Sequence, residues 1–176
     1  MSWRLKIPET GLLVVDVQEK LVAAVKEPAD WVEKVEILVK AAKLLEIPLA
    51  VTEQVPAKLG KTVPQIQQAM GKVAPSAKSA FSAVEAGRAL GRKRILVAGC
   101  EAHVCVRQTV YDLRQKEIQP VLVADAVGSR RETDRHLALQ EMRQDGIVIA
   151  STEAVLFELL ETAEHPKFKE IQGLIK

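Results

Sequence analysis

A buried strand followed directly by a helix, within residues 94–115, is the feature that most constrains this chain. The apolar run 95–98 is bounded by basic residues and stopped by Gly99, as is typical of a central strand in a parallel sheet. Beyond the glycine, apolar side chains recur at helical spacing, at Val106, Val110 and Leu113. We therefore expect a strand, a tight turn and a helix whose first turn holds Cys105.

That position suggests a chemical role for Cys105. A free cysteine with a pKa of ~8.5 is only a few per cent thiolate at neutral pH, and the partial positive charge of a helix start favours the anion. The pattern thus makes Cys105 a candidate nucleophile. The alternative is a small buried hydrophobic residue, the commoner role of a lone cysteine.

The rest of the chain alternates strand-like with helix-like segments. Strands are expected at 11–15, 48–52, weakly near 72–74, and at 94–99, 121–124 and 147–150. Helices are expected at 31–46, 65–70, 84–91, after 99, at 132–144 and from 152 onward. Six strands alternating with helices predict an α/β fold, a three-layer doubly wound sandwich with a mostly parallel six-stranded sheet. Right-handed crossovers leave few topologies, and the commonest has strand order 3-2-1-4-5-6.

In that order the chain reverses direction between strands 1 and 4, where ligands bind beyond the carboxyl ends of the strands. Asp16 ends the first strand and Cys105 follows the fourth, so the two are expected to meet in one crevice. A buried aspartate needs a partner, although Asp16 has the alternative role of capping the next helix. Lys78 is the one cation in a locally small, apolar loop, residues 77–81, and is a third candidate.

Composition limits the remaining possibilities. The 176 residues are 48% hydrophobic and 27% charged, which fits a single domain with a full core over 1–176. A net charge of +2 gives no bulk attraction to nucleic acid or membrane, and the basic clusters at 91–94 and 129–131 are most simply solvated loops rather than a phosphate site. The two cysteines indicate a cytoplasmic setting, no apolar run is long enough to cross a membrane, and the three histidines show no metal-ligand spacing. We expect no metal and no cofactor.

Several segments together resemble the isochorismatase-like cysteine hydrolases, a superfamily that includes nicotinamidases, N-carbamoylsarcosine amidases and isochorismatases. The matching segments are LLVVDVQ (12–18), AKSAFSA (77–83), AGCEAHVCV (98–106) and VLVADAVGSR (121–130). Three further segments are similar to the isochorismatase domain-containing subgroup: VTEQVPAKLGKTVP (51–64), RHLALQEMRQDG (135–146) and HPKFKEIQGLIK (165–176).

The resemblance implies a catalytic triad of Asp16, Lys78 and Cys105. The aspartate would take the thiol proton, the lysine would stabilise the thiolate, and the cysteine would attack a carbonyl carbon. It also implies a cis peptide bond at Cys100–Glu101, with the backbone N–H groups of Glu101 and Cys105 forming an oxyanion hole. Cys100, which ends a buried strand, is interpreted as structural. The predicted reaction is hydrolysis of a C–N bond in a small amide or ureido compound through a thioester.

Departures from the family pattern bear on the substrate. Nicotinamidases carry a metal tripod of one aspartate and two histidines after strand 2, whereas residues 52–65 here contain no histidine. Isochorismatases cleave a vinyl ether and can lack the cysteine, so its presence favours amidase chemistry, with vinyl-ether hydrolysis as the alternative. Four residues are predicted to line the substrate pocket because they lie at strand ends: Glu53, Gln54, Phe81 and His103.

A second alternative is a hydrolase fold that acts mainly as a binding or assembly module. Its support is an apolar stripe in the C-terminal tail (about 165–176), formed by Phe168, Ile171, Leu174 and Ile175. Such a stripe more often docks on its own domain or on a sister subunit than on a foreign partner. Family members commonly form dimers or larger closed assemblies, so the resemblance implies a homo-oligomer.

Overall fold

The chain folds around one six-stranded sheet, in which every neighbouring pair of strands is parallel. The structure, a computed structural model, describes residues 4–25 and 28–176. Its strands are β1 (Thr10–Val15), β2 (Leu49–Gln54), β3 (Ser76–Lys78), β4 (Arg94–Cys100), β5 (Gln119–Gly128) and β6 (Val148–Ala150). Their order is β3-β2-β1-β4-β5-β6, which confirms the predicted fold class and strand order.

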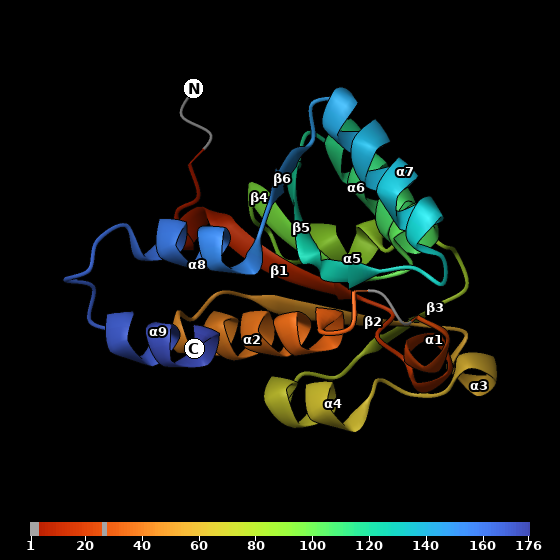
Figure 1. Ribbon diagram of the computed structural model, residues 1–176, viewed down its shortest axis with the longest axis horizontal. Helices are drawn as coiled ribbons and strands as arrows, with labels where there is room; N and C mark the ends of the chain where they lie inside the picture. Colours follow the sequence, from red (N-terminus) through yellow and green to blue (C-terminus); the bar gives the residue numbers. More distant parts are fainter. Residues whose placement is uncertain (1–3, 26–27) are drawn as a thin grey trace.

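Helices cover both faces of the sheet (Figure 1). One face packs against α2 (Trp31–Leu44), α4 (Pro64–Met70), α8 (Thr152–Leu160) and α9 (Phe168–Ile175). The other packs against α5 (Val84–Ala89), α6 (Arg107–Gln115) and α7 (Glu132–Gln144). The short helices α1 (Glu19–Ala24) and α3 (Pro56–Leu59) follow β1 and β2 and lie with β3 at one end of the sheet (Figure 1). The sequence pattern did not predict α1 or α3, since neither is long enough to show a period.

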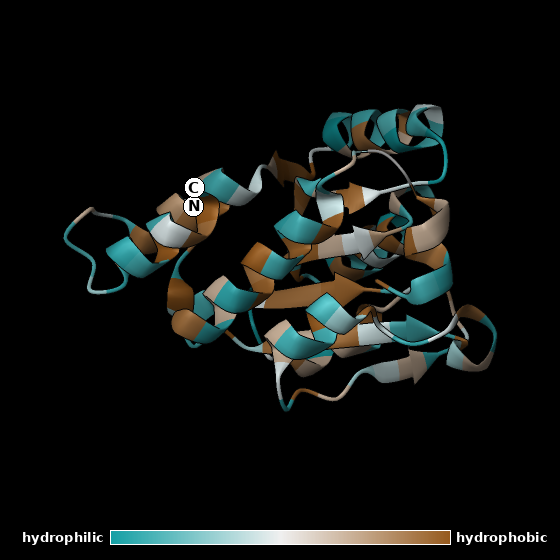
Figure 2. Cartoon of the chain, turned by 60° about the horizontal axis from the view of Figure 1, so that its bottom comes forward, coloured by the Kyte–Doolittle hydropathy of each residue, from teal (hydrophilic) through white to brown (hydrophobic). Residues whose placement is uncertain are grey.

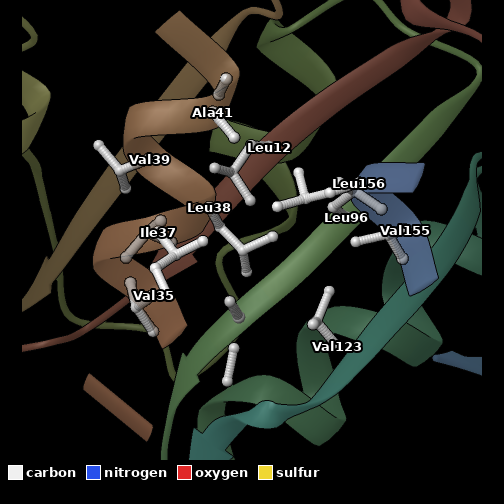
Figure 3. Close-up of a cluster of buried hydrophobic side chains, with 14 of the residues drawn as sticks. Leu12, Val35, Ile37, Leu38, Val39, Ala41, Leu96, Val123, Val155 and Leu156 are labelled. Carbon is white, nitrogen blue, oxygen red and sulfur yellow. The ribbon is translucent and has the colours of Figure 1, made fainter. Parts of the chain in front are cut away.

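Two apolar clusters, one on each face, hold the layers together. In the first, Leu38 of α2 faces the sheet beside Leu12 of β1, and Leu96 of β4 lies next to Val155 of α8 (Figure 3). All four of these residues are at most 2% exposed. Figure 2 shows the central strands in hydrophobic colours, between helices that also carry hydrophilic residues. Burial on both faces explains why β1 and β4 are continuous apolar runs.

The third strand is not where the sequence pattern placed it. The expected strand near 72–74 is wrong, and β3 forms at Ser76–Lys78, inside the stretch interpreted as a loop. Register with β2 defines this strand, since Thr52 pairs with Ser76 and Gln54 with Lys78. Its small polar residues carry no apolar alternation, so only pairing with β2 reveals it.

The C-terminal tail ends in α9, which packs on α2 and α8. Ile171 is fully buried, and the other three residues of the apolar stripe pack partly buried against the same core. The Phe157 and Phe168 rings lie 6.0 Å apart. The stripe is thus used within the chain, which removes the main support for a separate docking module. No helix in the described part of the chain is both long and apolar enough to cross a membrane.

Candidate active site

Asp16 lies directly after β1, completely buried, with hydrogen bonds to both oxygens of its side chain. Thr52 Oγ1 donates to Oδ1 at 2.8 Å, and Lys78 Nζ donates to Oδ2 at 2.6 Å. The residue adopts a positive φ of 53°, which aspartate tolerates better than most side chains. It does not cap α1, whose N-cap residue is Gln18. The alternative role of Asp16 as a helix cap is therefore wrong.

Lys78 ends β3, and its ammonium lies among four oxygen atoms. These are Asp16 Oδ2 and Gln54 Oε1, both at 2.6 Å, and the carbonyls of Ala80 and Phe81 at 3.2 and 2.9 Å. The side chain is only 12% exposed. An ammonium needs several acceptors when it leaves water, and the loop after β3 supplies two of them by folding back over the lysine.

Cys105 lies in a π-helical turn, η2 (Ala102–Val106), and α6 begins only at Arg107. Cys105 therefore lies in the first helical turn after β4, as expected, but this turn is π-helical rather than α-helical. Backbone N–H groups of Val104 and Val106 both donate to the Glu101 carbonyl, as in the π-bulges often found at functional sites.

The predicted lowering of the Cys105 pKa is also wrong. Burial, and then the negative charge of Asp16, raise the pKa of this thiol to about 12, although the Lys78 ammonium opposes them. A hydrogen bond to Asp16 contributes to the rise. Cys105 is therefore a neutral thiol at pH 7, in contact with a carboxylate that can accept its proton. The thiol is hydrogen-bonded to Asp16, as the strand order predicts, and it lies within range of the Lys78 charge.

The other cysteine supports Asp16 from behind. Cys100 ends β4, is fully buried and donates from Sγ to the backbone carbonyl of Asp16 at 3.1 Å. Burial raises its pKa well above the usual value. The peptide bond between Cys100 and Glu101 is cis. These contacts match the structural interpretation of Cys100.

Two threonines and a glutamine hold the site together, and the sequence pattern did not nominate them. Besides Thr52, buried Thr109 accepts from the Ala83 N–H at 2.8 Å and donates to the Cys105 carbonyl at 2.6 Å. Gln18 Oε1 accepts from the Gln54 N–H at 2.7 Å, and its Nε2 donates to the Gln54 carbonyl at 3.1 Å.

The four residues predicted to line the substrate pocket make different contacts. Gln54 touches Lys78 and donates to the Ser79 carbonyl at 2.7 Å, so it belongs to the lysine's surroundings. Glu53 Oε1 accepts from the N–H and hydroxyl of Thr62 at 2.7 and 2.8 Å, which anchors the loop after α3. Phe81 is 53% exposed. His103 Nδ1 lies 3.0 Å from Ser129 Oγ.

A hollow of about 380 Å³ lies beside Lys78. It opens between the end of β3 and α5, and Thr52 and Lys78 form part of its wall. Most of the remaining lining is alanine and serine, with the carboxylate of Glu85. The volume fits a small molecule. Within the described residues, no group of three or more histidine, cysteine, aspartate or glutamate side chains could hold a metal ion.

Comparison with known proteins places this chain in a family. The model of the isochorismatase domain matches residues 10–154. The chain belongs to the isochorismatase family. Isochorismatase domain-containing protein 2 of Danio rerio is 38% identical over 178 residues, which cover 98% of this chain and 89% of that protein. Isochorismatase domain-containing protein 1 of the same organism is 39% identical over 166 residues, covering 92% of this chain and 59% of that protein.

A solved structure of the family superposes closely. It is described as MAR1 ribonuclease from Caenorhabditis elegans and is 38% identical, with a TM-score of 0.93 over 98% of this chain and 92% of that one. The predicted superfamily is thereby confirmed, and the chain has the hydrolase fold of its relatives.

Proposed function

We propose that this protein is a cysteine hydrolase that cleaves a C–N bond in a small amide or ureido compound. The observation that carries the proposal is the single buried carboxylate shared by a thiol and an ammonium. Asp16 receives hydrogen bonds from Lys78 and Cys105. An assembly module has no need of a buried ion pair next to a thiol, since burying charges is costly.

In the first half of the reaction, Cys105 Sγ attacks the carbonyl carbon of the substrate while its proton moves to Asp16. The raised pKa of the thiol means that the proton leaves during attack rather than before it, so Asp16 acts as a general base. The Lys78 ammonium offsets the charge that develops on sulfur. The backbone N–H groups of Glu101 and Cys105 are proposed to bind the oxyanion, where one donor contributes about 3–4 kcal/mol.

In the second half, the tetrahedral intermediate expels the amine, which takes the proton held by Asp16, and a thioester remains on Cys105. Water then attacks the thioester while Asp16 accepts a proton from it. Collapse releases the carboxylic acid, and the proton returns to sulfur. Atoms and charges balance without a cofactor, and the hollow beside Lys78 restricts the substrate to a small molecule.

The test is a screen of small primary amides and carbamoyl compounds for ammonia release, with Cys105→Ala as the blank. We expect the variant to lose at least a thousandfold in kcat and to form no acyl adduct by mass spectrometry. Cys100→Ala is the matched control, because it removes the other buried thiol and should keep the chemistry. Full activity of Cys105→Ala on a substrate that the wild type hydrolyses would contradict the proposal.

Two other activities are included as outcomes of the same screen. Pyruvate release from isochorismate, with no ammonia from any amide, would assign vinyl-ether hydrolysis instead. Because a relative of 38% identity is described as a ribonuclease, a single-stranded RNA oligonucleotide is also included. Its cleavage by the wild type and by Cys105→Ala alike would place the activity outside the triad.

The homo-oligomer implied by the family resemblance stays a prediction. Light scattering coupled to size-exclusion chromatography should give a multiple of the 19.3 kDa chain mass. A peak at that mass across micromolar concentrations would contradict it.

A further inference from the structure

The end of β2 lies between the segments that carry Asp16 and Lys78. Thr52 of β2 pairs with Val15, the residue before Asp16. Two positions further on, Gln54 pairs with Lys78 of β3, and it is only 7% exposed. Because side chains alternate between the two faces of a sheet, Thr52 and Gln54 point to the same face. Gln54 can therefore connect the first strand to the lysine of the edge strand.

Gln18 continues the pairing of β1 with β2 beyond the end of β1. Its Oε1 accepts from the Gln54 N–H at 2.7 Å, and its Nε2 donates to the carbonyls of Gln54 and Gly60 at 3.1 and 2.7 Å. A primary amide offers the donor and the acceptor of a peptide group, so this side chain takes the place of a strand neighbour. Gln18 is completely buried, and its contacts fix the backbone of Gln54.

The side-chain amide of Gln54 holds the lysine through both of its ends. Oε1 accepts from Lys78 Nζ at 2.6 Å, and Nε2 donates to the Ser79 carbonyl at 2.7 Å. An ammonium can only donate and a carbonyl can only accept, so one orientation of the amide satisfies both partners. A carboxylate or an apolar side chain could not make both contacts. Gln54 thus fixes the Lys78 side chain together with the backbone that follows it.

The Lys78 ammonium acts on Cys105 as a fixed charge. The group has three N–H donors, and four protein oxygen atoms lie 2.6–3.2 Å from Nζ. The contacts within the described part of the chain therefore engage every N–H. In agreement, Lys78 opposes the rise in the Cys105 pKa through its charge, whereas the hydrogen bond that affects this thiol comes from Asp16. The effect of the lysine on the thiol then depends on where its acceptors hold it.

Gln54 is the best anchored of the neutral acceptors. The other two are the carbonyls of Ala80 and Phe81, which belong to the loop after β3, and Phe81 is 53% exposed. We propose that Gln54 is a positioning residue, which holds the Lys78 ammonium on Asp16 so that its charge acts on Cys105. This inference rests on the proposed function for the role of Cys105 as the nucleophile.

The first test measures proton exchange of the Lys78 ammonium by NMR of the ¹⁵N-labelled protein at pH 7. Its signal is identified by its absence from Lys78→Met. Gln54→Met keeps most of the side-chain volume but removes the acceptor, so we expect exchange with water to become at least about fivefold faster. Backbone amide exchange in β1 should change by less than about twofold, which separates a local effect from general unfolding.

The second test changes the charge around the ammonium. Gln54→Glu keeps the shape but places a second carboxylate on Lys78, and added negative charge opposes formation of the thiolate. We expect alkylation of Cys105 by iodoacetamide at pH 8, followed by mass spectrometry, to become at least about fivefold slower. If Gln54 only held the fold together, its replacement would expose the thiol and raise this rate instead.

The matched control is Gln68→Glu, which adds the same charge at an exposed position of α4 and should change the alkylation rate by less than about twofold. Two outcomes overturn the positioning role. One is ammonium exchange in Gln54→Met within about twofold of the wild type, and the other is an unchanged or raised alkylation rate in Gln54→Glu. Neither measurement needs turnover, so a screen in which no amide is hydrolysed would count against the proposed function alone.

Discussion

Replacing Lys78 by methionine tests whether the buried ion pair is the structural centre of the site. The substitution keeps most of the side-chain volume but leaves the completely buried Asp16 carboxylate with only two neutral donors, the Thr52 hydroxyl and the Cys105 thiol. Removing one partner of a buried pair destabilises a protein by about 3–5 kcal/mol. Because Lys78 is 12% exposed and water can partly replace it, we expect about 3 kcal/mol. For a chain of this length, that lowers Tm by about 6–12 °C.

The assay is urea unfolding together with a thermal melt, on the wild type and three variants. The double variant Asp16→Asn/Lys78→Met removes the uncompensated charge and should recover at least half of the loss, although all Lys78 variants should be inactive. Lys167→Met is the control, because its pair with Glu170 at 3.0 Å is exposed and should change stability by less than about 1 kcal/mol. A Lys78→Met variant as stable as the wild type would refute the reasoning, as would a double variant less stable than the single one.

Three further predictions test the surroundings of the pair. Because the Cys105 pKa is raised to about 12, the thiol stays protonated below that pH, so its alkylation by iodoacetamide should rise about tenfold per pH unit from pH 7 to 10; a plateau below pH 8 would contradict this. Thr109→Val removes the hydroxyl that accepts from the Ala83 N–H and donates to the Cys105 carbonyl, and should lose at least ~1 kcal/mol more unfolding free energy than Thr109→Ser, which keeps the hydroxyl; equal losses would show that the hydrogen bonds are unimportant. At Gly99 (φ 119°) an added Cβ would lie 2.0 Å from a backbone carbonyl oxygen of β1, whereas at Gly91 (φ 62°) nothing lies within 4 Å. We therefore expect Gly99→Ala to prevent soluble expression and Gly91→Ala to lower stability by only about 1–2 kcal/mol; similar behaviour of the two would indicate that backbone strain, not the clash, decides.

The strands buried on both faces were predictable, because a central parallel strand must be apolar along its whole length. The runs at 11–15 and 94–99 show this directly, and their positions within the chain led to the sheet order. The edge strand at Ser76–Lys78 was not predictable in the same way. It is short, polar and partly exposed, and its conformation follows from pairing with β2.

The residues of the candidate site likewise include some that could be predicted from the sequence and some that could not. Asp16 and Cys105 were identifiable because each lies shortly after a strand that the pattern predicts, and the strand order places the ends of those two strands together. Lys78 was nominated by its unusual context, although its contact with Asp16 depends on an edge strand that the pattern misplaced. Thr52 and Thr109 gave no signal, since a hydroxyl that bridges two distant backbones looks like any other threonine.

The sequence was therefore enough to predict the layers of this protein, the strand order and two of the three side chains of the candidate site. The reason is that the pattern of apolar residues in a strand or helix can be recognised within a short segment. Tertiary structure alone decided the protonation state of Cys105. The helix start argued for a thiolate, but the low dielectric of the interior and the fixed charge of Asp16 outweigh it and leave a neutral thiol. Burial and through-space charge depend on which distant segments surround an atom, and no local pattern encodes them.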